Sequence, residues 1–158
     1  TSPHLRDGRR RPRRVVTRLL DVNVLVALAW PNHVHHAAAH RWFTRLDAWA
    51  TTPITELGFI RVSSNARVLS EAVRPGDALD LLARMRRARG HTFWDDDVVL
   101  SEDDSGLAGR IVGHRQLTDA HLVLLARSHG GRVATFDRGM VQLVTGLMPD
   151  TVERIPTE

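Results

Sequence analysis

The sequence contains no cysteine, no lysine and no tyrosine, and its longest strongly apolar run, Val24 to Trp30, has only seven residues. The absence of cysteine excludes disulfides, thiolate zinc sites, iron–sulfur clusters and cysteine nucleophiles, and gives no sign of an oxidising compartment. The apolar run is far below the roughly 20 residues that cross a bilayer. We therefore expect a soluble protein without membrane contact, with a cytoplasmic location as the default.

The absence of lysine also narrows the phosphate chemistry that is open to this chain. Walker-type P-loops place a lysine ammonium on the phosphates of their nucleotide. Response-regulator receivers and most haloacid-dehalogenase-type phosphatases need a lysine too. Any phosphate chemistry here is therefore expected to depend on carboxylates and bound cations.

The net charge of +4 comes from the beginning of the chain. The first 18 residues contain seven arginines and one acid, which leaves 15 arginines against 17 acidic residues, a net charge of −2, in residues 19–158. Because the rest of the chain is slightly acidic, the overall charge does not indicate a nucleic-acid-binding domain. We interpret residues 1–17 as a basic, disordered leader, or as residues that precede a native start at Val15 or Val16.

From Thr17 onward, short apolar runs alternate with helical periods, a pattern typical of repeated strand–helix units. Strands are predicted at Val15–Leu20, Ala48–Thr52, His91–Trp94, Arg132–Phe136 and Thr151–Ile155. Helices are predicted at Val22–Ala29, Val34–Leu46, Ile54–Ser63, Gly76–Ala88, Asp119–His129 and Met140–Val144. No internal repeat interrupts this order. Residues 18–158 are therefore expected to form one α/β domain, a three-layer α/β/α fold with a largely parallel central sheet.

Four acidic residues are predicted to lie at one edge of this sheet. Asp21 and Asp137 follow predicted strands, and the carboxyl ends of parallel strands share the edge where such folds bind ligands. Glu56 and Asp119 lie in the first turns of helices that begin at the same edge. Each acid also has a simpler interpretation, as a helix cap, a first-turn residue or a turn residue. Their shared position favours a common site.

Four carboxylates in one small cleft require a compensating charge. Two like charges about 4 Å apart repel by about 4 kcal/mol at an effective dielectric constant of 20, so either some of them bind protons or a cation binds. Ligands that are all oxygen favour a hard ion such as Mg²⁺ or Mn²⁺. Such an ion activates water and polarises a phosphoryl group.

The segments around these acids resemble a known family. The segments are LLDVNVL with Asp21, ITELGFIR with Glu56, TDAHL with Asp119, and ATFDRG with Asp137. In this order they resemble PIN domains, especially the VapC toxins of toxin–antitoxin pairs, and the similarity extends over nearly all of residues 17–156. Any one segment alone is a weak signal.

The resemblance implies a metal-dependent endoribonuclease that cleaves structured RNA as the toxin of such a pair. It implies that Asp21, Glu56, Asp119 and Asp137 form the metal and water site, with Mg²⁺ or Mn²⁺ bound. It places Asn23 and Thr135 close to that site and Arg61 in contact with RNA or the partner. It further implies a homodimer and a cognate antitoxin whose tail enters the cleft. The basic leader departs from the family pattern.

Two other functions remain open at this stage. A non-catalytic RNA-binding or scaffold module would keep the fold without hydrolysis, and it would not need all four acids. An aspartate-based phosphatase would use Asp21 as nucleophile, since Asp21-Val-Asn23 resembles half of that motif, but its second aspartate and its lysine are missing.

Further side chains have both a functional and a structural interpretation. His36 and His40 lie one helical turn apart, as zinc ligands can, although a solvated or RNA-facing helix edge explains them as well. The four tryptophans are assigned to the core by default, with base stacking as the alternative. The arginines of residues 84–89 form either a phosphate-gripping helix end or a solvated face. Asp95–Asp97 are interpreted as a turn or cap, or as another acid near the site.

Overall fold

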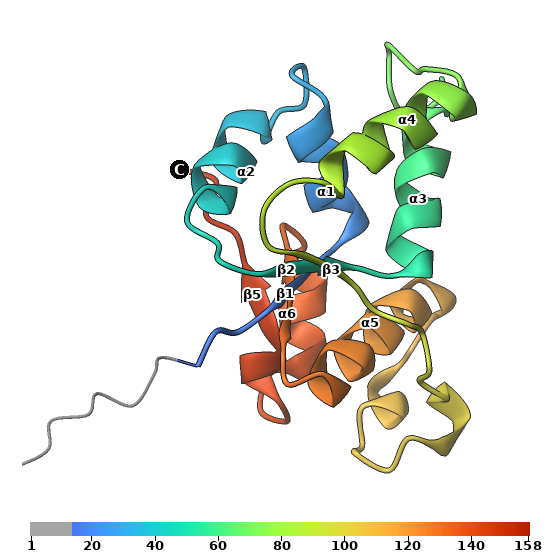
Figure 1. The fold of residues 1–158 in the computed structure, drawn as a ribbon. Coiled ribbons are helices and arrows are strands. Elements are labelled where there is room, and N and C mark those ends of the chain that lie inside the picture. The colour runs from blue at the N-terminus through green and yellow to red at the C-terminus, as the bar shows by residue number, and fades with distance from the viewer. Residues whose placement is uncertain (1–13) are drawn as a thin grey trace, which may run out of the picture.

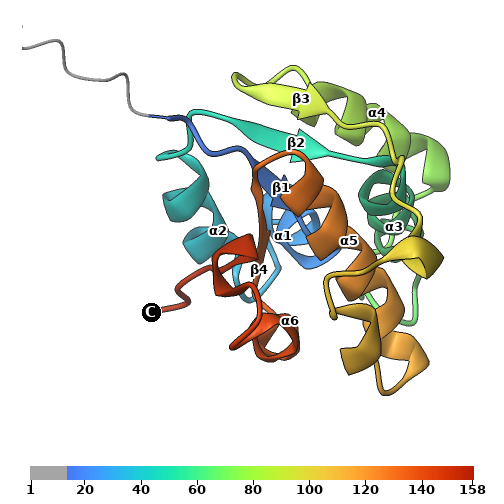
Figure 2. The same ribbon diagram turned by 90° about the horizontal axis from the view of Figure 1, so that it is seen from below.

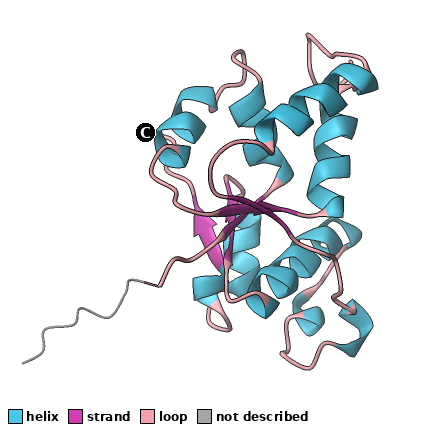
Figure 3. Ribbon diagram, in the orientation of Figure 1, coloured by secondary structure: helices cyan, strands magenta, loops and turns pink. Residues whose placement is uncertain are grey.

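A computed structural model describes residues 14–158 of the chain, so the predicted leader lies outside the described part except for its last four residues. Five strands form one sheet in the order β3-β2-β1-β4-β5, and all four pairings are parallel. The strands are β1 (Arg18–Leu20), β2 (Trp49–Thr51), β3 (His91–Phe93), β4 (Arg132–Thr135) and β5 (Val152–Arg154). Figure 3 shows this sheet between its covering helices.

Six α-helices lie within the described residues 14–158. They are α1 (Val22–Ala29), α2 (His36–Phe43), α3 (Pro53–Ser63), α4 (Pro75–Met85), α5 (Leu117–Ser128) and α6 (Arg138–Val144). Three short 3₁₀ turns, Leu100–Glu102, Ala108–Arg110 and His114–Gln116, connect β3 to α5, and a fourth, Pro149–Thr151, precedes β5. None of the helices in this part of the chain combines the length and apolar character needed to cross a bilayer.

The helices cover both faces of the sheet, which gives three layers (Figures 1 and 2). Helices α1 to α4 lie on one face, where Leu20 and Ala134 of the strands pack against apolar side chains such as Phe59 and Leu82. Helices α5 and α6 lie on the other face, where Leu19 and neighbouring strand residues pack against the apolar stripe of α5. Alternate residues of β1 therefore point into two separate cores, as the two-residue period of a strand requires.

The predicted three-layer fold with a largely parallel sheet is confirmed. Most elements begin or end a few residues from the predicted positions. The predicted strand Val15–Leu20 pairs only from Arg18 onward, and the predicted helix Val34–Leu46 is confined to His36–Phe43. Residues 98–110, for which the sequence predicts no clear element, contain two of the 3₁₀ turns.

The connection from α4 to β3 requires glycine at position 90. Gly90 has a φ of +87°, and a Cβ there would lie 2.4 Å from the main-chain oxygen of Asp47. Its own carbonyl accepts a hydrogen bond from the Trp49 N–H at 3.0 Å, which joins this turn to the start of β2. Both the backbone conformation and the available space therefore exclude a larger side chain.

We expect Gly90→Ala to lower the free energy of unfolding by about 1–3 kcal/mol, because it adds left-handed strain and a clash with backbone. Urea unfolding followed by circular dichroism measures this change. Gly76→Ala is the matched control at the start of the preceding helix, since nothing lies within 4 Å of its added Cβ. Equal stability of the two variants would contradict the role of Gly90.

Candidate active site

Asp21 is the first acid of the site and follows β1 directly. It caps α1: its Oδ1 accepts a hydrogen bond from the Val22 N–H at 2.8 Å, and its own N–H donates to the Ala134 carbonyl of β4 at 3.0 Å. Burial raises the pKa of Asp21 above its ordinary value, and the charge of Asp137 adds to this effect, although hydrogen bonds from Thr135 and Val22 oppose it. The hydrogen bonds thus fix the side chain in place. Its burial disfavours the charged form of the carboxyl.

Thr135, the last residue of β4, orients this carboxyl. Its hydroxyl donates to Asp21 Oδ2 at 2.8 Å and accepts from Asn23 Nδ2 at 3.3 Å and from the Asp137 N–H at 3.0 Å. A hydroxyl has one proton to donate and two lone pairs, so all of its hydrogen-bonding capacity is used. Asn23 also accepts from the Phe136 N–H at 3.4 Å. Asn23 and Thr135 therefore hold α1, β4 and the Asp137 loop together.

Asp137 and Asp119 approach the same place from the other face of the sheet. Asp137 is the exposed N-cap of α6, with its Oδ1 accepting from the Gly139 N–H at 2.8 Å. Asp119 lies half-buried in the first turn of α5. Its pKa is raised to about 6 by burial first, and then by the negative charges of Asp21 and Asp137. These three aspartates therefore lie within electrostatic reach of one another.

Glu56, the fourth predicted site acid, makes different contacts. It lies in the first turn of α3, where its Oε2 accepts from the Thr51 hydroxyl at 2.6 Å and its Oε1 lies 3.4 Å from Nη1 of Arg86. Thr51 also contacts His91 Nε2 at 2.8 Å. The charges that raise the pKa values of Asp21 and Asp119 are those of aspartates, and Glu56 is not among them. The structure thus brings three of the four predicted acids together, while Glu56 contacts β2 and the residue that follows α4.

The three aspartates fit a hard divalent cation by their chemistry. They offer only carboxylate oxygens, and burial together with neighbouring negative charges raises the pKa values of Asp21 and Asp119. Within residues 14–158, however, no three histidine, aspartate or glutamate side chains are already arranged to hold a metal ion. An ion here would require the carboxylates to move toward it.

A groove leads away from the aspartates along the surface between α1 and α3. It has a volume of about 470 Å³, and Asp21 and Asn23 lie at one end. The apolar residues Val62, Val68 and Leu69 form one wall. His33 lies in the same groove, and burial together with the neighbouring His35 and His36 lowers its pKa below the ordinary value. An extended ligand can therefore reach Asp21 from the side of the α1–α2 loop.

Several side chains have roles that the sequence did not predict. His36 Nδ1 and His40 Nε2 lie 2.8 and 2.9 Å from the carbonyls of Ala27 and Leu28, so both rings contact the end of α1, which explains their spacing without zinc. Asp96 Oδ1 lies 2.6 Å from His121 Nε2, an ion pair that joins the loop after β3 to α5 when the histidine is protonated.

The arginines and tryptophans for which the sequence left two interpretations lie partly in structural and partly in surface positions. Arg86 contacts Glu56 and lies over the Phe93 ring at 5.0 Å from its centroid, whereas Arg61 is exposed near the end of α3. Trp49 and Trp94 are buried in the core as predicted. Trp30 is only partly buried and lines a surface pocket. Its position in the sequence, directly before Pro31 and a polar loop, is the one signal that could have separated it from the core tryptophans.

Comparisons with known proteins all indicate the same family. The family model of the PIN domain matches residues 18–144 of this chain. Ribonuclease VapC39 of Mycobacterium tuberculosis is 53% identical over 127 residues, which are 79% of this chain and 91% of that protein. Ribonuclease VapC38 of the same organism is also 53% identical over 127 residues, 79% of this chain and 88% of the relative. Ribonuclease VapC29 is 41% identical over 140 residues, 86% and 99% of the two chains.

The family match extends from β1 to the end of α6, so it includes all four predicted acids and the strands that carry them. The relatives are covered over most of their own length as well. This chain therefore belongs to the PIN-domain family, as a VapC-type member.

Proposed function

We propose that this protein is a divalent-metal-dependent endoribonuclease and the toxin of a toxin–antitoxin pair. The observation that carries the proposal is the group of Asp21, Asp119 and Asp137, which come from three separate elements: the charge of Asp137 adds to the raised pKa of Asp21, and those of Asp21 and Asp137 add to the raised pKa of Asp119. A fold gains nothing in stability from collecting negative charge in this way, so such a group indicates a functional site. Because these relatives are named ribonucleases, we propose RNA as the substrate.

The aspartates would hold Mg²⁺ or Mn²⁺ through their oxygens. When bound, the ion would lower the pKa of a water molecule and neutralise charge on the scissile phosphate. The chain's own contribution is orientation: Thr135 and Asn23 fix Asp21, and the N-terminal turns of α5 and α6 present the other two carboxylates. Asp119, with its pKa of about 6, exchanges a proton close to neutral pH.

Glu56 joins the site in this proposal only if its side chain leaves Thr51 and Arg86. Its position in the first turn of α3 is compatible with such a rotation, since the helix itself begins at the active edge of the sheet. Arg61, exposed near the end of the same helix, is proposed to contact RNA or a protein partner. Cleavage of structured RNA, homodimer formation, a cognate antitoxin and a cytoplasmic location also belong to this proposal.

Specific observations argue against the two alternatives, a scaffold module and an aspartate-based phosphatase. A scaffold module has no use for a group of three aspartates in which burial and like charges disfavour the charged forms of Asp21 and Asp119. A phosphatase with Asp21 as nucleophile would need a second aspartate two residues later, where Asn23 instead contacts Thr135. It would also need a lysine, which the sequence lacks.

Replacing Asp21 by Asn tests the proposal most directly. We expect Asp21→Asn to reduce RNA cleavage at least about 100-fold, because the cation loses a ligand, while the protein stays folded. Gel analysis of RNA treated with the purified full chain measures cleavage, and circular dichroism measures folding. Asp80→Asn, on the exposed side of α4, is the matched control and should cleave like wild type. Full activity of Asp21→Asn would place the reaction elsewhere.

Binding of the cation should stabilise the fold. With Mg²⁺ at about 100 times its dissociation constant, mass action contributes about 2.7 kcal/mol, or roughly 5–10 °C in melting temperature for a chain of this size. Thermal melts in MgCl₂ and in EDTA, matched in ionic strength with NaCl, measure the shift. The Asp21→Asn variant should show a much smaller shift. A wild-type melting temperature that is the same in both buffers would argue against the metal site.

Without metal, the Asp119 carboxylate should make stability depend on pH. Its folded pKa of about 6 lies above the ordinary value of 3.8 for an aspartate. The folded state therefore binds the proton more tightly, and its stability is greatest below about pH 4 and falls as the pH rises through about 6. Because Asp119 is partly exposed, the loss is on the order of 1 kcal/mol.

Asp119→Asn should remove that loss. In EDTA at pH 8 the variant should be more stable to urea than wild type, whereas near pH 4 the difference should disappear. The same variant should lose RNA cleavage if Asp119 is a metal ligand. A variant that is less stable than wild type at pH 8 would mean that Asp119 supports the fold rather than the reaction.

A further inference from the structure

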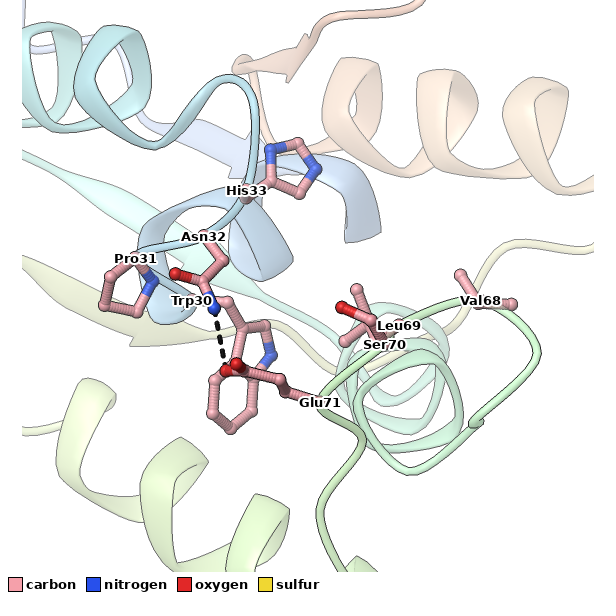
Figure 4. A pocket seen from close by; sticks show the side chains of 8 residues that line it. All are labelled: Trp30, Pro31, Asn32, His33, Val68, Leu69, Ser70 and Glu71. Carbon is pink, nitrogen blue, oxygen red and sulfur yellow. Dashed lines mark hydrogen bonds between the residues drawn. The ribbon is translucent and has the colours of Figure 1, made fainter.

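A second hollow lies beside the groove that leads to Asp21 (Figure 4). It has a volume of about 240 Å³ and lies between the α1–α2 loop and the segment that follows α3. His33, Val68 and Leu69 line both this hollow and the groove, so the two are neighbours that share a wall. An extended chain that passes Asp21 can therefore place one side group in the hollow, which we call the loop pocket.

The loop pocket has the size and an aromatic wall suited to a flat ligand. Pockets for drug-sized molecules measure about 300–1,000 Å³, so this smaller volume suits a single base. Trp30 lines the pocket, and its indole Nε1 donates to the Ser63 hydroxyl at 3.0 Å, which fixes the ring. His33 is held as well, since its Nδ1 accepts from the His35 N–H at 3.0 Å. Bases of unpaired RNA commonly stack on such side chains.

The polar edge of the loop pocket is rich in hydrogen-bond acceptors. Asn32 Nδ2 donates to Glu71 Oε2 at 2.7 Å, which joins the two loops across the pocket (Figure 4). Asn32 keeps one amide N–H and its carbonyl oxygen, and both carboxylate oxygens of Glu71 can accept further hydrogen bonds. A ligand that satisfies the Glu71 carboxylate must bring donors. Among the bases, guanine alone carries two adjacent donor groups, N1–H and the N2 amino group, which match a carboxylate.

We propose that the loop pocket binds a guanine base close to the cleaved bond, with Glu71 as the residue that selects it. This inference rests on the proposed nuclease function, because a cation held by the acid group would bind the phosphate of the same RNA. Glu71 acts in recognition and touches no reacting atom. Asn32 positions the Glu71 carboxylate.

The test compares base preference in wild type and in Glu71→Gln. The full chain with Mg²⁺ is given a pool of RNA hairpins that is randomised in the loop, and the product ends are sequenced. Wild type should favour guanine at one position near the cut, and Glu71→Gln should reduce the ratio of guanine to other bases about 10-fold, as loss of a paired base contact does. Glu102→Gln, an exposed glutamate in the 3₁₀ turn after β3, is the matched control.

A binding measurement supplies a readout that does not depend on cleavage. Fluorescence anisotropy with the Asp21→Asn protein compares an RNA that carries guanosine at the favoured position with one that carries inosine, which lacks the N2 amino group. Guanosine should bind about 10-fold more tightly. The combined Asp21→Asn, Glu71→Gln protein should not distinguish the two RNAs.

The outcomes separate this inference from the proposed function. RNA cleavage with the same base preference in wild type and Glu71→Gln would overturn the guanine pocket alone, and would leave the loop pocket to a protein partner. No cleavage by wild type or by the folded Glu102→Gln control would overturn the nuclease proposal and the pocket with it.

Discussion

The parallel pairing of β1 with β4 is the constraint on which the site depends. The register sets Leu20 opposite Ala134, so the next residues, Asp21 and Thr135, meet at the carboxyl edge of the sheet and form a hydrogen bond. Because both strands lie in the middle of the sheet and are covered on both faces, neither can shift without moving its apolar residues out of a core. The position of the carboxylate is thereby fixed by burial of Leu19 and Leu20, whose side chains lie in the two cores.

The acid group destabilises the folded state, and the contacts and cores around it offset this destabilisation. Like charges held together in a partly buried place repel strongly, and the raised pKa values of Asp21 and Asp119 measure that repulsion together with desolvation. The hydroxyl of Thr135 and the N–H of Val22 offset part of it at Asp21. The remainder is tolerated because both central strands are buried after their first residues, so stability comes from the two cores rather than from the site.

Sequence patterns can predict those positions of the candidate site that depend on the main chain alone. Asp21 and Asp137 follow strands, and Asp119 lies in the first turn of a helix, so the alternation of strands and helices was enough to place all three at one edge. The order of the layers followed from the same alternation. The family resemblance added Asn23 and Thr135, whose contacts to each other and to the aspartates appear in the structure.

Side-chain direction could not be predicted in this way. Glu56 also begins a helix at the active edge, but its carboxylate contacts Thr51 and Arg86, and Arg86 comes from a helix 30 residues later in the chain. No local pattern indicates that pairing. The same holds for His36 and His40. Their spacing suits metal binding as well as it suits contacts with the carbonyls at the end of α1. In both cases the partner is distant in sequence, so only the assembled fold decides between the interpretations.

The acid group and the loop pocket are built from different parts of the fold. The aspartates are positioned by β1, β4 and the helices that follow them, which are held by the two cores. The loop pocket is formed by the end of α1, the α1–α2 loop and the segment after α3, which meet through Asn32 and Glu71. Connections of this kind accept substitution more readily than core strands do. A change at position 32 or 71 would therefore alter the loop pocket without removing any hydrogen bond of Asp21.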